Sequence, residues 1–187
     1  NLKRFIRRDY DISPDAPNEA SRLWYQMVFT DWQKPSCQNS HMFKNILFDS
    51  TYERWSELGT LYGFSRYSAV TISNISAAGH VYNHFQTMYY QMAVLLCFYR
   101  GALLYFSNKS EEMAKEINSI QSGKKEKKLR SRINRLHTKF ILFKNKYWFK
   151  EVTAQDQGIE IFDLWSDRMR NNILKQEVED EIKELYT

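Results

Sequence analysis

The stretch that most constrains the fold is a basic segment in the C-terminal half of the chain. Its apolar residues recur at alternating spacings of four and three, at Leu129, Ile133, Leu136, Phe140, Phe143 and Tyr147. This spacing keeps one apolar seam on one face of an α-helix. Residues 124–150 also hold eleven lysines and arginines against the single acid Glu126, a local net charge of +10. The sequence therefore predicts a long helix with one buried face and basic flanks.

A second long helix is predicted after a short turn. Thr153 has Asp156 three residues later, which is typical of a helix N-cap with an acid in the first turn. Helical spacing then continues to the end of the sequence, through Ile161, Phe162, Trp165, Met169, Ile173, Leu174, Val178, Ile182 and Leu185. We therefore expect one uninterrupted, stalk-like helix over 154–186.

A third long helix is predicted ahead of the basic segment, beginning near His80. A broad apolar stripe runs from Phe85 to Phe106, and the helix either breaks at Ser107 or continues to about Ile120. Cys97 lies within this apolar run, so we expect a buried thiol. Arg100 and several tyrosines in the same run favour a helix of a globular domain over a membrane span.

The N-terminal part of the chain predicts shorter, mixed elements. Residues 1–18 predict an edge strand, and helices are expected over 18–32 and 40–48. Ser50 and Glu53 form a capping-box pattern, which predicts a short helix that ends at Gly59. The alternation over 60–72 predicts one or two β-strands with a kink at Gly63.

Together these patterns predict a predominantly helical α+β fold. A small N-terminal α/β region, residues 1–79, precedes three long antiparallel helices in residues 80–187, and the two are expected to pack as one compact domain. A hydrophobic content of 43%, with only three prolines and six glycines, indicates an ordered protein.

No catalytic motif is present in the sequence. His80 and His84 share a helical face at a spacing of four, but no third metal ligand is near them. Cys37 and Cys97 form neither a CxxC pattern nor a disulfide framework. Because no residues suggest a reaction, we predict that the chain is not an enzyme.

Acidic residues form one stripe near the end of the last predicted helix, at Glu177, Asp180, Glu181 and Glu184. Carboxylate oxygens are the ligands that Mg²⁺ and other hard divalent cations prefer. The stripe is therefore a candidate metal site if a second subunit brings further carboxylates. The alternative is a solvent-facing helix flank without a ligand.

The basic segment admits several partners. A basic face suits nucleic acid, an anionic membrane surface or an acidic helix, and it is also typical of a solvated flank. Tyr147, Trp148 and Phe149 at its end could stack on the bases of single-stranded nucleic acid. However, the seam positions are better explained as core and no recognition module is present, so nucleic acid is the less favoured partner.

Three stretches resemble uncharacterised bacterial proteins that are similar to CorA divalent-cation transporters: residues 147–164, residues 54–68 and residues 35–39. The resemblance implies that the chain is a cytoplasmic domain that supports or gates the transport of magnesium or another divalent ion. It also implies a homo-oligomer at the inner membrane, with a membrane span beyond Thr187. The Gly-Met-Asn pore motif of the transporters does not occur in these residues.

The same resemblance implies a structural helix hairpin between the basic helix and the last helix. Its motif residues are Tyr147, Trp148, Glu151, Thr153, Gln155 and Gly158. A second interpretation remains open, in which the chain is a free-standing cytosolic interaction module. In that case the basic helix would bind an acidic partner or nucleic acid.

Overall fold

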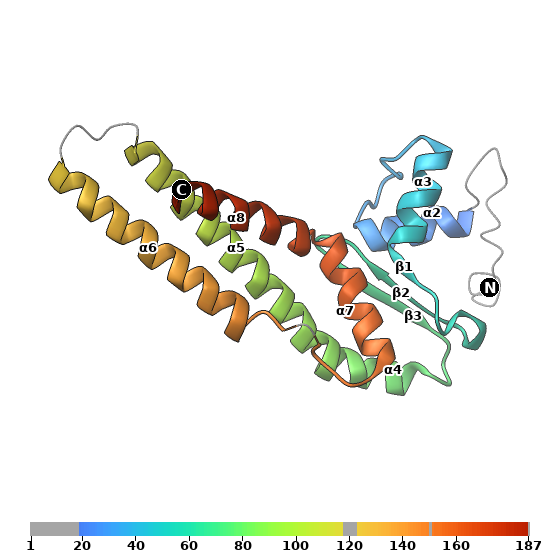
Figure 1. Cartoon of the computed structure of the whole chain (residues 1–187). Helices are drawn as coiled ribbons and strands as arrows, with labels where there is room; N and C mark the ends of the chain where they lie inside the picture. Colours follow the sequence, from blue (N-terminus) through green and yellow to red (C-terminus); the bar gives the residue numbers. More distant parts are fainter. Residues whose placement is uncertain (1–18, 118–122, 150, 187) are drawn as a thin grey trace. The chain divides into compact units, whose positions relative to one another are not determined.

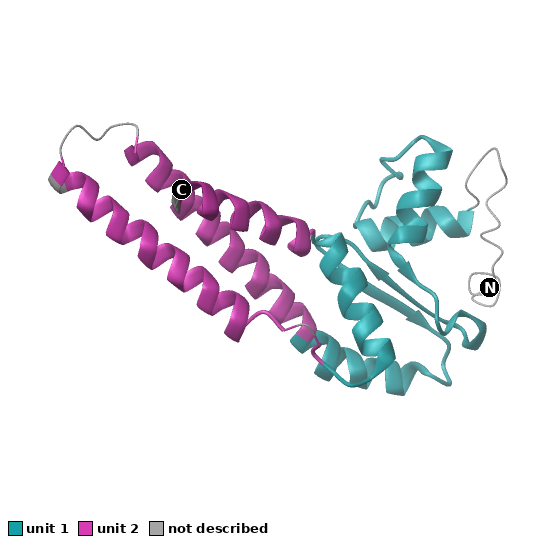
Figure 2. Ribbon diagram, viewed as in Figure 1, with its two compact units in different colours: residues 1–91, 153–169 teal, residues 92–152, 170–187 magenta. Residues whose placement is uncertain are grey.

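The computed structural model describes the chain except for residues 1–18, 118–122, 150 and 187, and so the predicted N-terminal edge strand lies outside the described residues. The fold is predominantly helical α+β, as the sequence predicts (Figure 1). Packing divides the chain into two compact units that are both discontinuous in sequence (Figure 2). Unit 1 comprises residues 1–91 and 153–169, and unit 2 comprises residues 92–152 and 170–187.

Unit 1 is built on a three-stranded antiparallel sheet in the order β1-β2-β3. The strands are β1 (Thr51–Tyr52), β2 (Thr60–Phe64) and β3 (Ala69–Ser73). Tyr62 in the middle of β2 lies opposite Tyr52 on one side and Thr71 on the other. The alternating stretch predicted over 60–72 is therefore a β-hairpin, and β2 is its central strand.

One face of this sheet is covered by α2 (Glu19–Phe29) and α3 (Ser40–Asp49). Trp24, Val28, Phe43 and Leu61 belong to one buried cluster on this side. Gly63 explains how close α2 comes, because a Cβ built there would lie 2.8 Å from Trp24 Cζ2 and closer still to Val28 Cγ2. The glycine predicted to kink the strand thus provides the space into which α2 packs.

The other face of the sheet is covered by helices from two distant parts of the chain. α4 (Ala78–His84) continues directly into a π-helical turn, η2 (Phe85–Tyr89), and α7 (Asp156–Arg168) comes from the C-terminal half. The Tyr62 ring lies 5.8 Å from the Tyr89 ring, and the Phe64 ring lies 5.1 Å from the Trp165 ring. All five residues of β2 are buried, because helices cover both faces of the sheet.

Unit 2 is a bundle of three helices: α5 (Tyr90–Ile117, whose first two residues belong to unit 1), α6 (Gly123–Lys146) and α8 (Asn171–Tyr186). α5 and α6 run antiparallel, and their Phe106 and Phe140 rings lie 5.2 Å apart. Asn171 of α8 donates from Nδ2 to the Leu96 carbonyl, and Ser107 donates to Glu181, so α8 runs parallel to α5. The predicted up-down-up order of long helices is present in this unit.

The heptad seam of α6 behaves as its spacing predicts. The first five seam residues are all buried, with exposed fractions of 6% or less: Leu129, Ile133, Leu136, Phe140 and Phe143. Tyr147 lies just beyond the helix and is 44% exposed. The seam therefore ends with the helix.

The single helix predicted over 154–186 is wrong. α7 ends at Arg168, and Arg170 adopts a left-handed backbone with φ of 58° before α8 begins at Asn171. The two helices belong to different units: α7 lies in unit 1 and α8 in unit 2. Apolar periodicity carries no signal of this break, because both halves keep a buried face.

Three local predictions are also wrong. Ser50 does not begin a helix: it is the C-cap residue of α3, a strand follows at Thr51, and only a 3₁₀ turn forms later, at 56–58. Thr153 is not the N-cap of α7, which is Gln155; the Thr153 hydroxyl accepts a hydrogen bond from the Gln155 backbone N–H instead. Cys97 is exposed, because it faces outward from α5.

α5 continues through Ser107 to Ile117 without a break. Among the residues that the structure describes, none of the helices combines the length and the apolar character that crossing a membrane requires.

Candidate functional site

The acidic residues predicted as a metal site lie on α8, but the fold separates them. Glu177, Asp180 and Glu184 are exposed, whereas Glu181 is half-buried and accepts a hydrogen bond from the Ser107 hydroxyl of α5 at 3.2 Å. Asp180 contacts the amide of Gln176 at 3.0 Å and the ammonium of Lys183 at 3.7 Å. Three of the four predicted ligands thus share an outward face.

No metal site is formed by the described residues. They contain no group of three or more His, Cys, Asp or Glu side chains that could hold a metal ion. His80 and His84 on α4 therefore have no third ligand among these residues. A groove of about 460 Å³ between α5 and α8 is lined by Glu111, Glu181 and Glu184, but these carboxylates do not form such a group either. A cation on the α8 stripe therefore remains a prediction that needs further ligands.

The basic residues of α6 form a continuous stripe beside its apolar seam. We define the basic stripe as Lys125, Lys128, Arg132, Arg135, Lys139 and Lys146. The spacings are three, four, three, four and seven, with Leu142 in the last interval, so at 100° per residue all of these side chains project from one side of α6. All but the half-buried Arg132 are exposed.

Only one member of the basic stripe is paired with a carboxylate among the described residues. Arg132 donates to both oxygens of Glu116 on α5, at 2.6 and 2.5 Å, and this lowers the pKa of Glu116. Lys146 lies over the Tyr147 ring, and no anion faces it in the described chain. Lys128 lies close enough to Glu116 for its charge to lower the pKa of that carboxylate. The other four members form no ion pair among the described residues, so they are available to a partner.

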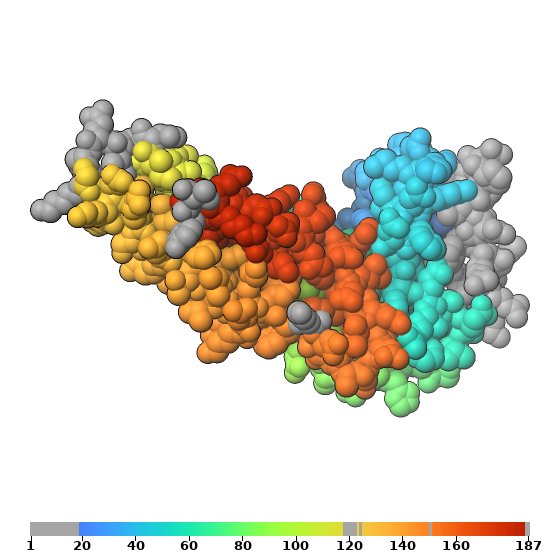
Figure 3. All heavy atoms as spheres, viewed as in Figure 1, coloured from blue at the N-terminus to red at the C-terminus, as the bar shows by residue number. Residues whose placement is uncertain are grey.

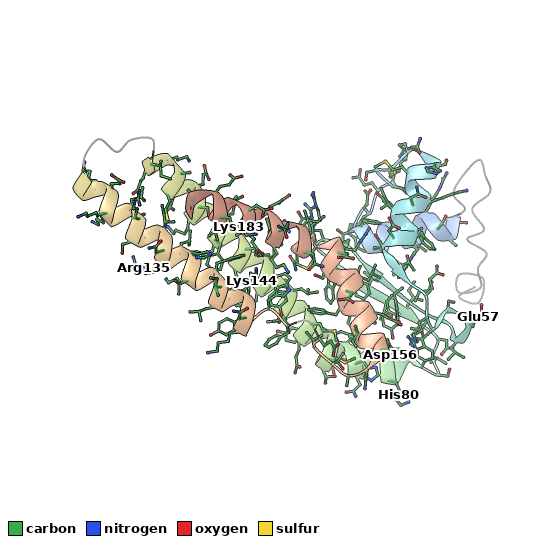
Figure 4. All side chains as sticks on the ribbon, in the orientation of Figure 1. Glu57, His80, Arg135, Lys144, Asp156 and Lys183 are labelled. Carbon is green, nitrogen blue, oxygen red and sulfur yellow. The ribbon has the colours of Figure 1, made fainter. Side chains whose placement is uncertain are left out.

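The opposite flank of α6 is used inside the bundle. Lys144 donates to Glu179 of α8 at 2.6 Å, and this hydrogen bond lowers the pKa of Glu179. Arg135 and Lys144 are nine residues apart and thus project from opposite sides of the helix (Figure 4). In the space-filling view the surface of α8 adjoins that of α6 (Figure 3). One flank of α6 binds α8, and the other flank carries the basic stripe.

A groove of about 320 Å³ lies between α5 and α6 along the basic stripe. Its cationic walls are Lys109 of α5 and Arg132, Arg135 and Lys139 of α6. Its apolar lining is Tyr105, Met113 and Leu136. This combination suits an anionic group that is carried on an apolar or aromatic framework.

The residues of the predicted hairpin motif have structural contacts. The Trp148 ring stacks on the Tyr99 ring at 4.4 Å and lies 4.8 Å beneath the Lys175 ammonium. The Phe149 backbone N–H donates to the Tyr99 hydroxyl at 2.8 Å. Glu151 is exposed and Gly158 is buried in α7. These contacts fix the chain after α6 against α5 and α8.

A polar network that the sequence did not suggest holds α7 against the rest of unit 1. Trp55 Nε1 donates to Gln157 Oε1 at 2.8 Å, and Gln157 Nε2 donates to the Tyr89 hydroxyl. Burial raises the pKa of Tyr89, so this hydroxyl stays neutral. Gln157 is thereby bonded to two aromatic residues that come from different elements.

Glu160, one turn further along α7, makes a second pair of contacts. It accepts hydrogen bonds from the Tyr52 hydroxyl and from Arg54, the latter at 2.6 Å. These bonds lower the pKa of Glu160, and burial together with the Glu160 hydrogen bond raises the pKa of Tyr52. No local pattern in the sequence points to these contacts, because Glu160 and its two partners lie about a hundred residues apart.

Comparison with known protein families, characterised proteins and solved structures finds no significant match for this chain. Its function is therefore inferred from its own residues. Two surfaces are notable, namely the basic stripe with its groove and the acidic face of α8.

Proposed function

We propose that this chain is a non-catalytic, cytoplasmic domain of a CorA-like membrane protein and that it supports or gates the passage of divalent cations. In this proposal the domain lies at the inner membrane, works as a homo-oligomer and is joined to membrane spans beyond Thr187. The sequence resemblance described above is the origin of the proposal.

The observation that carries the proposal is the contact between two stretches of that resemblance. Residues 54–68 and 147–164 are far apart in the sequence, yet Trp55 bonds Gln157 and Arg54 bonds Glu160 in unit 1. Phe162, also in the second stretch, is buried. The residues that resemble the CorA-like proteins therefore hold α7 against the sheet of unit 1. A domain shared with those proteins would need such contacts, and this supports the proposal.

In this function the polar network around α7 would transmit a change in helix position and would not catalyse a reaction. Polar contacts between elements have discrete arrangements, so they can couple the position of one helix to another. Glu160 is suited to this because its two donors come from the segment around β1. A signal that moves α7 would have to break these bonds.

The experiment is to read the natural coding sequence past the codon for Thr187, express the whole product and measure Mg²⁺ uptake into membrane vesicles. Two apolar spans of about twenty residues and Mg²⁺ uptake are expected. Glu160→Gln should lower the uptake, whereas Glu57→Gln, which changes an exposed carboxylate of the same unit, should leave it unchanged. A coding sequence that ends soon after Thr187, with the product in the soluble fraction, would overturn the proposal.

A second candidate function is favoured by the four cations of the basic stripe that form no ion pair among the described residues, Lys125, Arg135, Lys139 and Lys146. In it the chain is a free-standing cytosolic module whose basic helix binds an acidic partner or nucleic acid. Fluorescence anisotropy with a single-stranded RNA at increasing salt tests the nucleic-acid form. Binding that weakens steeply with salt supports it, and no binding at low salt contradicts it.

A further inference from the structure

The basic stripe of α6 needs a partner with regularly spaced negative charge. Its cations follow one another at intervals of three and four residues, about 4.5 to 6 Å along the helix axis. Leu142, which is 56% exposed, occupies the position that would continue the series after Lys139. A fitting partner therefore presents acids at helical intervals, followed by an apolar side chain.

The outer face of α8 has this pattern. Ile173, Glu177, Asp180 and Glu184 follow at intervals of four, three and four, and all four side chains are exposed. Val178 and Ile182, which are buried, project from the opposite side of α8. The acidic face therefore points away from the core of its own bundle.

The two faces match when the helices are antiparallel. Aligning Leu142 with Ile173 places Lys139 beside Glu177 and Arg135 beside Asp180. Arg132 is not counted, because it is bonded to Glu116 of its own copy. No pair is displaced by more than one residue, about 1.5 Å of helix rise. We propose that the basic stripe of α6 binds the acidic face of α8 from a second copy of this chain, with one apolar pair and two ionic pairs.

The pairing must be between copies and not within one. α6 and α8 of the same copy already pack through other faces, and Lys144 and Glu179 join them at 2.6 Å. Within one copy the acidic face points outward from α8, while the basic stripe lies on the flank of α6 opposite Lys144. The two matching surfaces cannot meet without taking the bundle apart.

A second copy explains the surface better than a nucleic acid does. The exposed Leu142 needs an apolar contact, which a phosphate backbone does not offer. Ile173 on α8 of a second copy offers one. The groove beside the stripe also adds apolar lining from Tyr105 and Leu136, which a helix can use. Exposed ion pairs are individually weak, so the association is expected to depend on both salt and concentration.

Each copy carries both halves of this contact, so the interface can repeat from one copy to the next. Such an interface closes into a ring or continues as a filament, depending on the rotation between copies. The counter-ions of the α8 carboxylates are then side chains of another copy. This inference names the interface of the homo-oligomer in the proposed function, but it does not require ion transport.

The test uses two charge-reversal variants of the full chain in sedimentation velocity. Variant A is Arg135→Glu with Lys139→Glu, and variant B is Glu177→Lys with Asp180→Lys. Wild type is expected to self-associate at low salt and to dissociate at high salt, and each variant should weaken association by about tenfold or more. The control, Lys34→Glu with Lys127→Glu, has the same charge change as variant A at exposed lysines outside the stripe and should associate like wild type.

Mixing the variants provides the decisive measurement. Variant A alone has two acidic faces and variant B alone has two basic ones, whereas in the mixture each face meets an opposite charge. Association should therefore return on mixing, and circular dichroism checks that both variants are folded. A monomeric wild type at low salt, or a mixture that stays dissociated, would overturn the proposal.

Loss of RNA binding in variant A with a monomeric wild type would assign the stripe to nucleic acid instead. Neither result touches the uptake experiment, which tests transport separately.

Discussion

The two units of this protein achieve a buried core in different ways. Unit 1 depends on particular residues at particular places: a glycine that admits α2, and an amide on α7 that satisfies a tryptophan and a tyrosine. Unit 2 depends on repetition, because the seam of α6 is buried along its whole length while its flanks carry charge. A Cβ at Gly63 of unit 1 would overlap its neighbours, whereas a Cβ at Gly101 of unit 2 would meet open space.

The largest difference is expected at the glycines. Gly63→Ala should destabilise the protein by about 3 kcal/mol, because the new methyl group overlaps Trp24 and Val28 in a packed core. Gly101→Ala on α5 meets no atom within 4 Å and should stabilise by about 1 kcal/mol through helix propensity. Urea unfolding followed by circular dichroism measures both. Equal effects of the two substitutions would remove the contrast between the units.

A smaller loss of stability is expected when the stacking of Trp148 on Tyr99 in unit 2 is removed. Trp148→Ala should lower the free energy of unfolding by about 2 kcal/mol, because the half-buried ring stacks on Tyr99 and lies under Lys175. The matched control is Trp32→Ala, which removes a ring from a residue that is 75% exposed and should change little. Thermal melting compares the pair, and an unchanged melting temperature for Trp148→Ala would contradict the packing described here.

The polar network of unit 1 should show coupling. Gln157→Ala removes the amide that bonds Trp55 Nε1 and the Tyr89 hydroxyl and should cost about 1.5 kcal/mol. Once Tyr89→Phe has removed the hydroxyl, the same substitution should cost less, by about 0.5 to 1 kcal/mol. A double-mutant cycle from chemical unfolding measures the difference. Strict additivity would mean that the network does not act as a unit.

The smallest effect concerns pH. Hydrogen bonds from Tyr52 and Arg54 lower the pKa of Glu160 in the folded protein. A lowered folded-state pKa means that the stabilisation is present above the unfolded value, about 4.3, and is lost as the pH falls through the folded-state value. Glu160→Gln should therefore flatten the fall in melting temperature between about pH 5 and pH 3. Melting curves that keep the wild-type slope would show that Glu160 contributes nothing in this range.

The sequence was most informative where local pattern and final burial agree. The seam of α6 and the chain turn at Gly59 both follow from the chemistry of neighbouring residues. The outward face of α8 was also foreseen as an acidic stripe. Glu181 belongs to the same predicted stripe, but it is half-buried and accepts a hydrogen bond from Ser107 on another helix. Helical spacing alone does not tell which side of a stripe turns inward.

By itself, the sequence determined the helical character of the C-terminal half, the strands of the β-hairpin and the basic flank, since these depend on periodicity and local charge. Only the tertiary structure decided that the helix breaks at Arg170 and that α7 returns to the sheet of unit 1. It also decided that Gln157 and Glu160 meet Trp55 and Arg54. Those contacts join residues about a hundred positions apart, and such partners are selected by packing and not by the residues beside them in the chain.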